Sequence, residues 1–180
     1  MKGRRVSVAL TQSHKAGGSA VAEKTFDIVF EGVGTSSGKM RNDISVSWPM
    51  MKESFELATD EGPFHGGDGT APPPLALFLA ALTGCLMTQI RAFAKRMNIT
   101  VNNVEVKARL HWTGVQEDND PYVTHPKSFD LDVDIDSPAD AEALTRLLQA
   151  AKKGCFIEQS LAEGVIVGHR LKVDGEWQDC

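Results

Sequence analysis

Two cysteines from distant parts of the chain are the residues best suited to carry chemistry. Cys85 lies in the middle of a long apolar segment, and Cys155 directly follows Gly154. Because seventy positions separate them, no local motif such as C-x-x-C joins them. Cytoplasmic cysteine pairs are often catalytic or redox-active, but free cysteine is also among the most buried residue types. Residue types alone therefore leave two interpretations open, a reactive pair and two core thiols.

The surroundings of each cysteine favour a reactive pair. Ala81 and Gly84 leave space beside the sulfur of Cys85. Cys155 stands between a helix end and a short helix, which places its thiol at a helix N-terminus. The helix dipole favours the thiolate there. The third cysteine, Cys180, is terminal, and we expect no role for it.

A glycine-rich loop before the apolar segment holds His65 and Asp68. A solvated turn explains both residues. A nucleophile pair of Cys85 and His65, as in a cysteine hydrolase, is an alternative, although no third group that would orient the histidine is evident. The loop lacks the glycine pattern and the lysine of nucleotide sites, so we expect no nucleotide cofactor.

Four aspartates alternate along one strand, at positions 130, 132, 134 and 136. Alternate residues share a face, so a cation site is geometrically possible. A solvated strand face opposite Lys107 and Arg109 is the more common explanation. The five histidines show no metal-ligand spacing, and we predict no metal.

Composition indicates an ordinary globular protein. The chain has 180 residues, of which 42% are hydrophobic and 24% charged, with a net charge of −5. The acidic balance excludes a nucleic-acid-binding surface. The basic N-terminus lacks an apolar run long enough for a signal peptide, so we expect a cytoplasmic protein. Residues 1–24 form a polar extension, and residues 25–180 form a single domain.

Hydrophobic periodicity predicts the elements that position the two cysteines. Residues 75–97 form a long helix whose apolar face recurs every three or four residues. Arg91, Lys95 and Arg96 argue against a membrane span for it. Alternation predicts strands at 6–10 (weakly), 26–31, 43–48, 55–57, 104–112, 129–136 and 165–173. A second helix starts with Ser137 as its cap and ends at Gly154, and a short helix covers 157–162.

The order of these elements predicts the fold class. Strands cluster before and after the helices instead of alternating with them, which is typical of an α+β fold with largely antiparallel sheets. Gly114 to His125 should form the polar end of a hairpin between two of the strands. The long helix lies at the centre of this arrangement and carries Cys85.

Two segments of the chain resemble the OsmC/Ohr family of osmotically induced and organic hydroperoxide resistance proteins. The first is GGDGTAPPPLALFLAALTGC, residues 66–85, with the strand that follows the helix. The second is AAKKGCFIEQSLAEGVIVGHRLKV, residues 150–173. The resemblance covers about residues 25–173. It implies an OsmC-like fold and an intertwined homodimer, with the central helices packed together and the sites at the subunit interface.

The resemblance also implies an activity. Cys85 would be the peroxidatic thiol of a hydroperoxide reductase and Cys155 the resolving thiol. Organic hydroperoxides would be reduced to alcohols through a Cys85 sulfenic acid and a Cys85–Cys155 disulfide. An external dithiol would then reduce the disulfide, and no cofactor is needed. An OsmC-like protein that binds or scavenges small molecules, with inert thiols, is the alternative.

The residues around the thiols depart from the family pattern in three places. Phe156 follows the second cysteine, where a proline is usual. The hydroperoxide branch of the family carries a glutamate just before its glycine pair, whereas here the nearest acid before the pair is Glu61. Arg41 is a loose match to a family arginine. A thiol on an apolar helix needs a nearby cation, which Arg41 or His65 would supply, and Glu61 joins them as a candidate activating residue. The apolar candidates for substrate binding, which would favour alkyl hydroperoxides, are Phe78, Leu82 and Leu86.

Overall fold

The structure is a computed structural model that describes residues 24–165, 167–173 and 175–179. The weak strand expected near Val6 to Leu10 and the terminal Cys180 lie outside the described residues. The elements, in chain order, are β1 (Glu31–Ser37), β2 (Arg41–Trp48), β3 (Glu53–Thr59), the short 3-10 helix η1 (Pro63–His65), α1 (Pro74–Met97), β4 (Asn103–Val115), β5 (Val123–Asp136), α2 (Ala141–Gly154), α3 (Phe156–Ala162), β6 (Arg170–Val173) and β7 (Glu176–Asp179).

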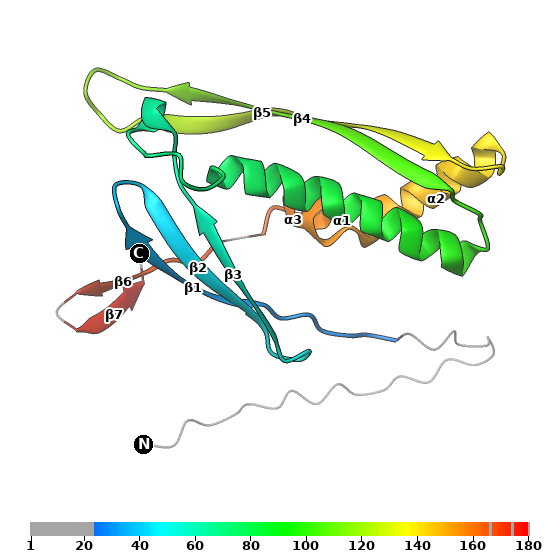
Figure 1. The fold of residues 1–180 in the computed structure, drawn as a ribbon, viewed down its shortest axis with the longest axis horizontal. Coiled ribbons are helices and arrows are strands. Elements are labelled where there is room, and N and C mark those ends of the chain that lie inside the picture. Colours follow the sequence, from blue (N-terminus) through cyan, green and yellow to red (C-terminus); the bar gives the residue numbers. More distant parts are fainter. Residues whose placement is uncertain (1–23, 166, 174, 180) are drawn as a thin grey trace, which may run out of the picture.

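The predicted α+β class is confirmed. In the described part of the chain, β1, β2 and β3 form one antiparallel sheet, and β4–β5 and β6–β7 form two antiparallel hairpins. Figure 1 shows the β4–β5 hairpin running alongside α1, α2 and α3 lying next to that helix, and the β1–β3 sheet extending away from it. The long helix is therefore the element on which the other elements assemble.

Helix α1 begins and ends as its sequence dictates. Pro74 occupies the first helical position, where its missing N–H costs nothing. Asn98 ends the helix in the left-handed conformation at φ 60°, and its N–H donates to the carbonyl of Ala94. One face is buried at every fourth residue and packs against α2 and β4. The buried residues of this face are Leu82, Leu86, Ile90 and Ala94.

The opposite face of α1 is open in the single chain. By length and composition alone the helix could cross a membrane, and 17% of its most apolar window is buried in the described chain. The exposed face carries small residues at helical spacing: Ala80, Ala81, Gly84 and Thr88. A Cβ atom added at Gly84 would meet nothing within 4 Å. Because the side chains on this face are small, they would not prevent another helix from approaching closely.

The β4–β5 hairpin is longer than the sequence predicted. The expected loop at 114–125 shortens, because β4 continues to Val115 and β5 starts at Val123. Pro126 fits into β5 because the register shifts between His111 and Trp112, and a proline without an N–H is tolerated at such an irregularity. The aspartate stripe lies as expected, with Asp132 opposite Lys107 and Asp130 opposite Arg109. It is a charged strand face.

Three other predictions of element boundaries were wrong. No strand forms at 26–31; β1 starts at Glu31 and passes through two glycines, because hydrogen bonds to β2 sustain it as far as the turn at Gly38. Asp140 caps α2 by accepting from the Ala143 N–H at 2.7 Å, while the Ser137 hydroxyl donates to the Thr100 carbonyl. The last strand shrinks to β6 and pairs with β7, which the sequence did not predict.

The loop that leads into α1 is built around a buried carboxylate. Asp60 is 2% exposed and accepts hydrogen bonds from the Glu61 N–H, the Thr70 N–H and the Thr70 hydroxyl. The bonds from Thr70, followed by that from Glu61, hold the Asp60 pKa below its ordinary value despite burial. Gly67 is also buried, and a Cβ atom there would overlap the Glu61 carbonyl. Close packing and hydrogen bonding thus fix this loop.

We expect Gly67→Ala to destabilise the protein by about 2 kcal/mol or more, because the added methyl group would overlap the Glu61 backbone carbonyl and lie 2.9 Å from the buried Asp60 Oδ1. The matched control is Gly62→Ala in the same loop. A Cβ there meets nothing within 4 Å, and φ is −74°, which alanine adopts freely. The free energy of unfolding, measured by denaturant titration, should fall only in the first variant. Equal stability of the two variants would contradict the described loop packing.

Candidate functional site

The fold brings the two predicted cysteines together. Cys85 lies in the middle of α1, half-buried, and Cys155 stands at the junction of α2 and α3, where it is fully buried. Both belong to the hydrophobic core formed by α1, α2 and β4, and both are free thiols. The approach of α2 to α1 depends on Gly154, because a side chain there would collide with the ring of Phe93. Sequence reasoning thus identified a pair that the tertiary structure assembles.

Burial controls the protonation of Cys155. Desolvation raises the pKa of its thiol to about 11, and the neighbouring Cys85 thiol adds to the rise. The thiol does sit at the start of α3, as predicted, and the Glu158 N–H partly counteracts the increase. The prediction that the helix end favours a thiolate was nevertheless wrong, because desolvation raises the Cys155 pKa more than the N–H group at the helix start lowers it. Cys155 is a neutral thiol at physiological pH.

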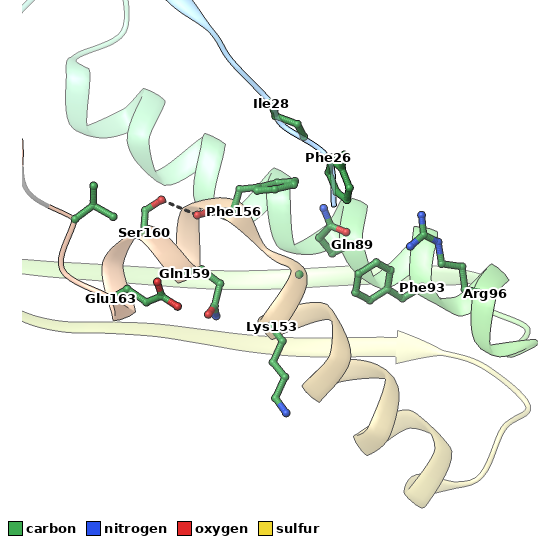
Figure 2. A pocket seen from close by; sticks show the side chains of 12 residues that line it. Phe26, Ile28, Gln89, Phe93, Arg96, Lys153, Phe156, Gln159, Ser160 and Glu163 are labelled. Carbon is green, nitrogen blue, oxygen red and sulfur yellow. Dashed lines mark hydrogen bonds between the residues drawn. The ribbon is translucent and has the colours of Figure 1, made fainter. Parts of the chain in front are cut away.

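A cavity of about 590 Å³ opens next to the α2–α3 junction, between α1, α3 and the extended segment before β1, and the Cys155 thiol itself does not line it. Figure 2 shows Phe26, Ile28 and Phe156 around it, with Phe93 and Arg96 on α1 and the Lys153 side chain turned away from the aromatic rings. The residue after Cys155 therefore forms part of the cavity wall. The wall combines five apolar side chains with six polar or charged ones, so the cavity suits a molecule that has both an apolar and a polar part.

The candidate activating residues gather at a different place, the amino end of α1. Glu61 and His65 line a second hollow of about 1050 Å³ together with Pro73 and Leu75. Cys85 lies eleven residues beyond Pro74, which is ~16 Å along a helix axis. Within one chain, His65 therefore forms no nucleophile pair with Cys85. The activating role of these residues stays a prediction.

Arg41 lies beside the same amino end of α1 and makes specific contacts. Its Nε and Nη2 atoms donate to Asp43 Oδ1 at 3.0 and 2.8 Å, and Nη1 donates to Thr70 Oγ1 at 3.0 Å. Hydrogen bonds from the Ser37 hydroxyl and then from Arg41 lower the Asp43 pKa. Sequence reasoning missed Asp43 and Thr70. The only available signal for Asp43 was that alternate residues of a strand share a face.

The three apolar candidates for substrate binding lie under the β4–β5 hairpin or in the core. Leu82 and Leu86 are 1% and 2% exposed. The Phe78 ring is 6.1 Å from the ring centroids of both Trp112 and Phe129. These contacts show that the three residues pack the chain together, and a contact with substrate stays a prediction. In the described ranges, no group of three His, Cys, Asp or Glu side chains could hold a metal ion.

Comparison with solved structures reveals the same architecture elsewhere. An OsmC-like hydroperoxide resistance protein from Jannaschia sp. CCS1 is 47% identical, with a TM-score of 0.59, over 85% of this chain and 98% of that one. An organic hydroperoxide resistance protein OsmC from Legionella pneumophila shares 16% identity and a TM-score of 0.52, over 77% and 91%. An organic hydroperoxide resistance protein from Elizabethkingia anophelis shares 16% identity and a TM-score of 0.53, over 77% of this chain and 91% of that one. These two distant matches show the fold alone.

Comparison of sequences leads to the same family. A search of curated proteins gives no match. The family model described as OsmC-like protein matches residues 67–170, more than half of the chain, and this range contains both cysteines. The resemblance that the glycine loop and the cysteine regions indicated is therefore confirmed: the chain belongs to the OsmC-like family.

Proposed function

We propose that this protein reduces organic hydroperoxides to alcohols with Cys85 as the attacking thiol and Cys155 as the resolving thiol. The observation that carries the proposal is the meeting of two free thiols, seventy positions apart, in one core. The Jannaschia relative, a hydroperoxide resistance protein at 47% identity, supports the choice of substrate. The absence of any local cysteine motif makes this meeting a property of the fold.

The chemistry has two steps within the protein. The Cys85 thiolate attacks the terminal oxygen of the hydroperoxide, so that an S–O bond forms, the O–O bond breaks, and the alkoxide leaves as the alcohol after taking a proton. The Cys155 sulfur then attacks the Cys85 sulfenic acid, forming the disulfide and releasing water. An external dithiol reduces the disulfide and is itself oxidised.

Exposure and protonation support this division of roles. Cys85 is half-buried, so its sulfur is more accessible than the fully buried sulfur of Cys155. Cys155 is fully buried and has a pKa of about 11, which makes it a poor first nucleophile at neutral pH. A sulfenic acid on the adjacent sulfur is a strong electrophile, and a nearby thiol is then sufficient. The cavity next to the α2–α3 junction would take the alkyl group of the substrate.

A second copy of the chain would complete the site. Cys85 needs a cation, whereas Arg41, Glu61 and His65 lie around the amino end of α1, whose first residue is ~16 Å from Cys85 along the helix axis. The exposed small-residue face of α1 lets a second α1 pack against it. In such an intertwined homodimer, the activating residues of one copy would face the thiols of the other. A cytoplasmic location would supply the reducing dithiol.

Peroxidase turnover provides the direct test. The protein with a dithiol reductant should consume cumene hydroperoxide, and Cys85→Ser should abolish the reaction. Cys155→Ser should consume about one equivalent and retain an added oxygen atom, because no thiol remains to resolve the sulfenic acid. Cys180→Ser is the control and should keep full activity. Mass spectrometry after one equivalent of peroxide should show the loss of two hydrogen atoms in the parent protein.

Turnover that survives Cys85→Ser would contradict this assignment. Binding of the hydroperoxide without consumption would instead favour the small-molecule binding or scavenging alternative.

The pKa of Cys155 predicts the order in which the thiols are alkylated. In a Cys180→Ser background, Cys155 should react with iodoacetamide only as the pH approaches about 11, so the more accessible Cys85 should be modified first. Peptide mass mapping across pH measures both reactions. The unfolded chain is the control, because desolvation is lost there and Cys155 should react near its ordinary pKa of 9.0. Simultaneous labelling in the folded protein would refute the inferred burial.

The raised pKa also links Cys155 to stability. Folding keeps the Cys155 thiol protonated, so its raised pKa contributes to the free energy of unfolding. That contribution is fully present below pH 9.0 and is lost as the pH rises through about 11.

Gly84→Leu should turn the dimer into monomers, since the leucine would hold two α1 helices apart. Gly84→Ala is the matched control, because it adds a single methyl group and improves helix propensity. Both side chains fit the single chain, where nothing lies within 4 Å of the added Cβ. Sedimentation equilibrium gives the mass of each variant. A Gly84→Leu protein that remains dimeric would place the interface elsewhere.

A further inference from the structure

We propose that Thr70 is a positioning residue that orients the Arg41 guanidinium for its part in activating the reactive thiol. The inference rests on the proposed function, in which Arg41 is a candidate cation. Thr70 lies four residues before α1 and is exposed, with no place in the hydrophobic core. Its side chain nevertheless joins two charged groups from different parts of the chain.

The geometry is a chain of short hydrogen bonds. Arg41 Nη1 donates to Thr70 Oγ1 at 3.0 Å, and Thr70 Oγ1 donates to Asp60 Oδ2 at 2.8 Å. The Thr70 N–H donates to the same Asp60 oxygen at 2.9 Å, which fixes the threonine backbone as well. The hydroxyl therefore bridges β2 and the end of β3, two strands that approach the amino end of α1.

The chemistry of the three groups determines the direction of both hydrogen bonds. A carboxylate only accepts and a guanidinium only donates, whereas a hydroxyl has one proton and two lone pairs. The single proton of Thr70 must point to Asp60, which leaves the oxygen lone pairs for Arg41. Serine can perform the same role, but valine, which has the shape of threonine, cannot.

Asp60 makes this arrangement permanent. Its carboxylate is 2% exposed and lies on the loop that Gly67 packs. Hydrogen bonds lower its pKa, so it stays ionised at physiological pH and always takes the proton of Thr70. The lone pairs of the hydroxyl are therefore always available to Arg41.

Asp43 holds the other side of the guanidinium, and Thr70 completes the alignment. Nε and Nη2 of Arg41 donate to Asp43 Oδ1, which fixes one edge of the plane. The Ser37 hydroxyl donates to the other Asp43 oxygen, Oδ2, at 2.7 Å, so the carboxylate is itself held in place. Thr70 adds a second fixed point, on Nη1, which donates to the hydroxyl at 3.0 Å and to the Thr70 carbonyl at 3.5 Å. The hydroxyl contact is the shorter of the two and is the one that valine removes.

The test compares Thr70→Val with the matched control Thr70→Ser. Stopped-flow oxidation of Cys85 by cumene hydroperoxide should slow about tenfold or more in the valine variant, which loses a hydrogen bond to a charged group. The serine variant should stay within about twofold of the parent. Thermal unfolding checks that both variants fold, and Thr70→Ala replaces the valine variant if that one does not.

A purely structural role predicts different results in two further measurements. Alkylation of Cys85 by iodoacetamide should show a higher pH midpoint in Thr70→Val and the same limiting rate at high pH, because the thiolate is less stabilised but otherwise unchanged. In an Arg41→Met background, Thr70→Val should cost nothing more, since Thr70 acts through Arg41. Equal rates in the valine and serine variants, or an unchanged cost without Arg41, would overturn the proposal.

The alkylation profile also separates this proposal from the proposed function. It reads the effect of the cation on Cys85 without any peroxide. If the protein consumes no hydroperoxide but the profile shifts in Thr70→Val, the substrate assignment fails and the role of Thr70 stands. If hydroperoxide is consumed and the profile does not shift, the role of Thr70 fails and the substrate assignment stands.

Discussion

The contact that seats the α2–α3 junction against the middle of α1 is the constraint on which the site depends. It removes Cys155 from water and sets it next to Cys85, so the same packing that completes the core also defines the pair of thiols. Gly154 allows this close approach, because a Cβ atom there would collide with the Phe93 ring unless that ring moved. The core and the site are therefore not separable in this chain. A substitution that disturbs the packing of the core should therefore also change the positions of the two thiols.

The single chain leaves much apolar surface uncovered. Val33 in β1 is 70% exposed, and Phe55 and Leu57 in β3 are each 47% exposed. The β1–β3 sheet extends away from α1, and α1 has one open face (Figure 1). Exposed apolar patches of this kind mark surfaces that another molecule covers. The same arrangement keeps the candidate cations of one chain apart from its own thiols, so a second copy would satisfy both requirements at once.

The sequence predicted those parts of the fold in which local pattern and tertiary structure agree. The proline start and apolar face of α1 gave that helix almost to the residue, and strict alternation gave the core of β4–β5. The β1 strand was missed because its glycines have no side-chain pattern and its hydrogen bonds come from β2. Asp140 and Ser137 were both suitable caps, and only the path of the chain decides between them.

The site followed the same rule. Family resemblance paired Cys85 with Cys155, and the structure brings them into one core. The hydrogen-bond chain from Asp60 through Thr70 to Arg41 joins three segments with no common motif, so no local pattern could reveal it. The direction of the Cys155 pKa shift could not be predicted from the sequence either. Its position at a helix start predicted a lowered pKa, whereas its burial, which is a tertiary property, raises the pKa.

The buried, protonated state of Cys155 has a consequence for regeneration of the proposed enzyme. When a dithiol attacks the disulfide at the more accessible Cys85 sulfur, Cys155 must depart as the leaving group. A thiol with a pKa of about 11 departs slowly, because leaving-group ability falls as the pKa rises. Attack at the other sulfur is blocked, since Cys155 is fully buried. In the proposed cycle, the oxidised protein would thus be the long-lived form, and the supply of reductant would govern the rate of turnover.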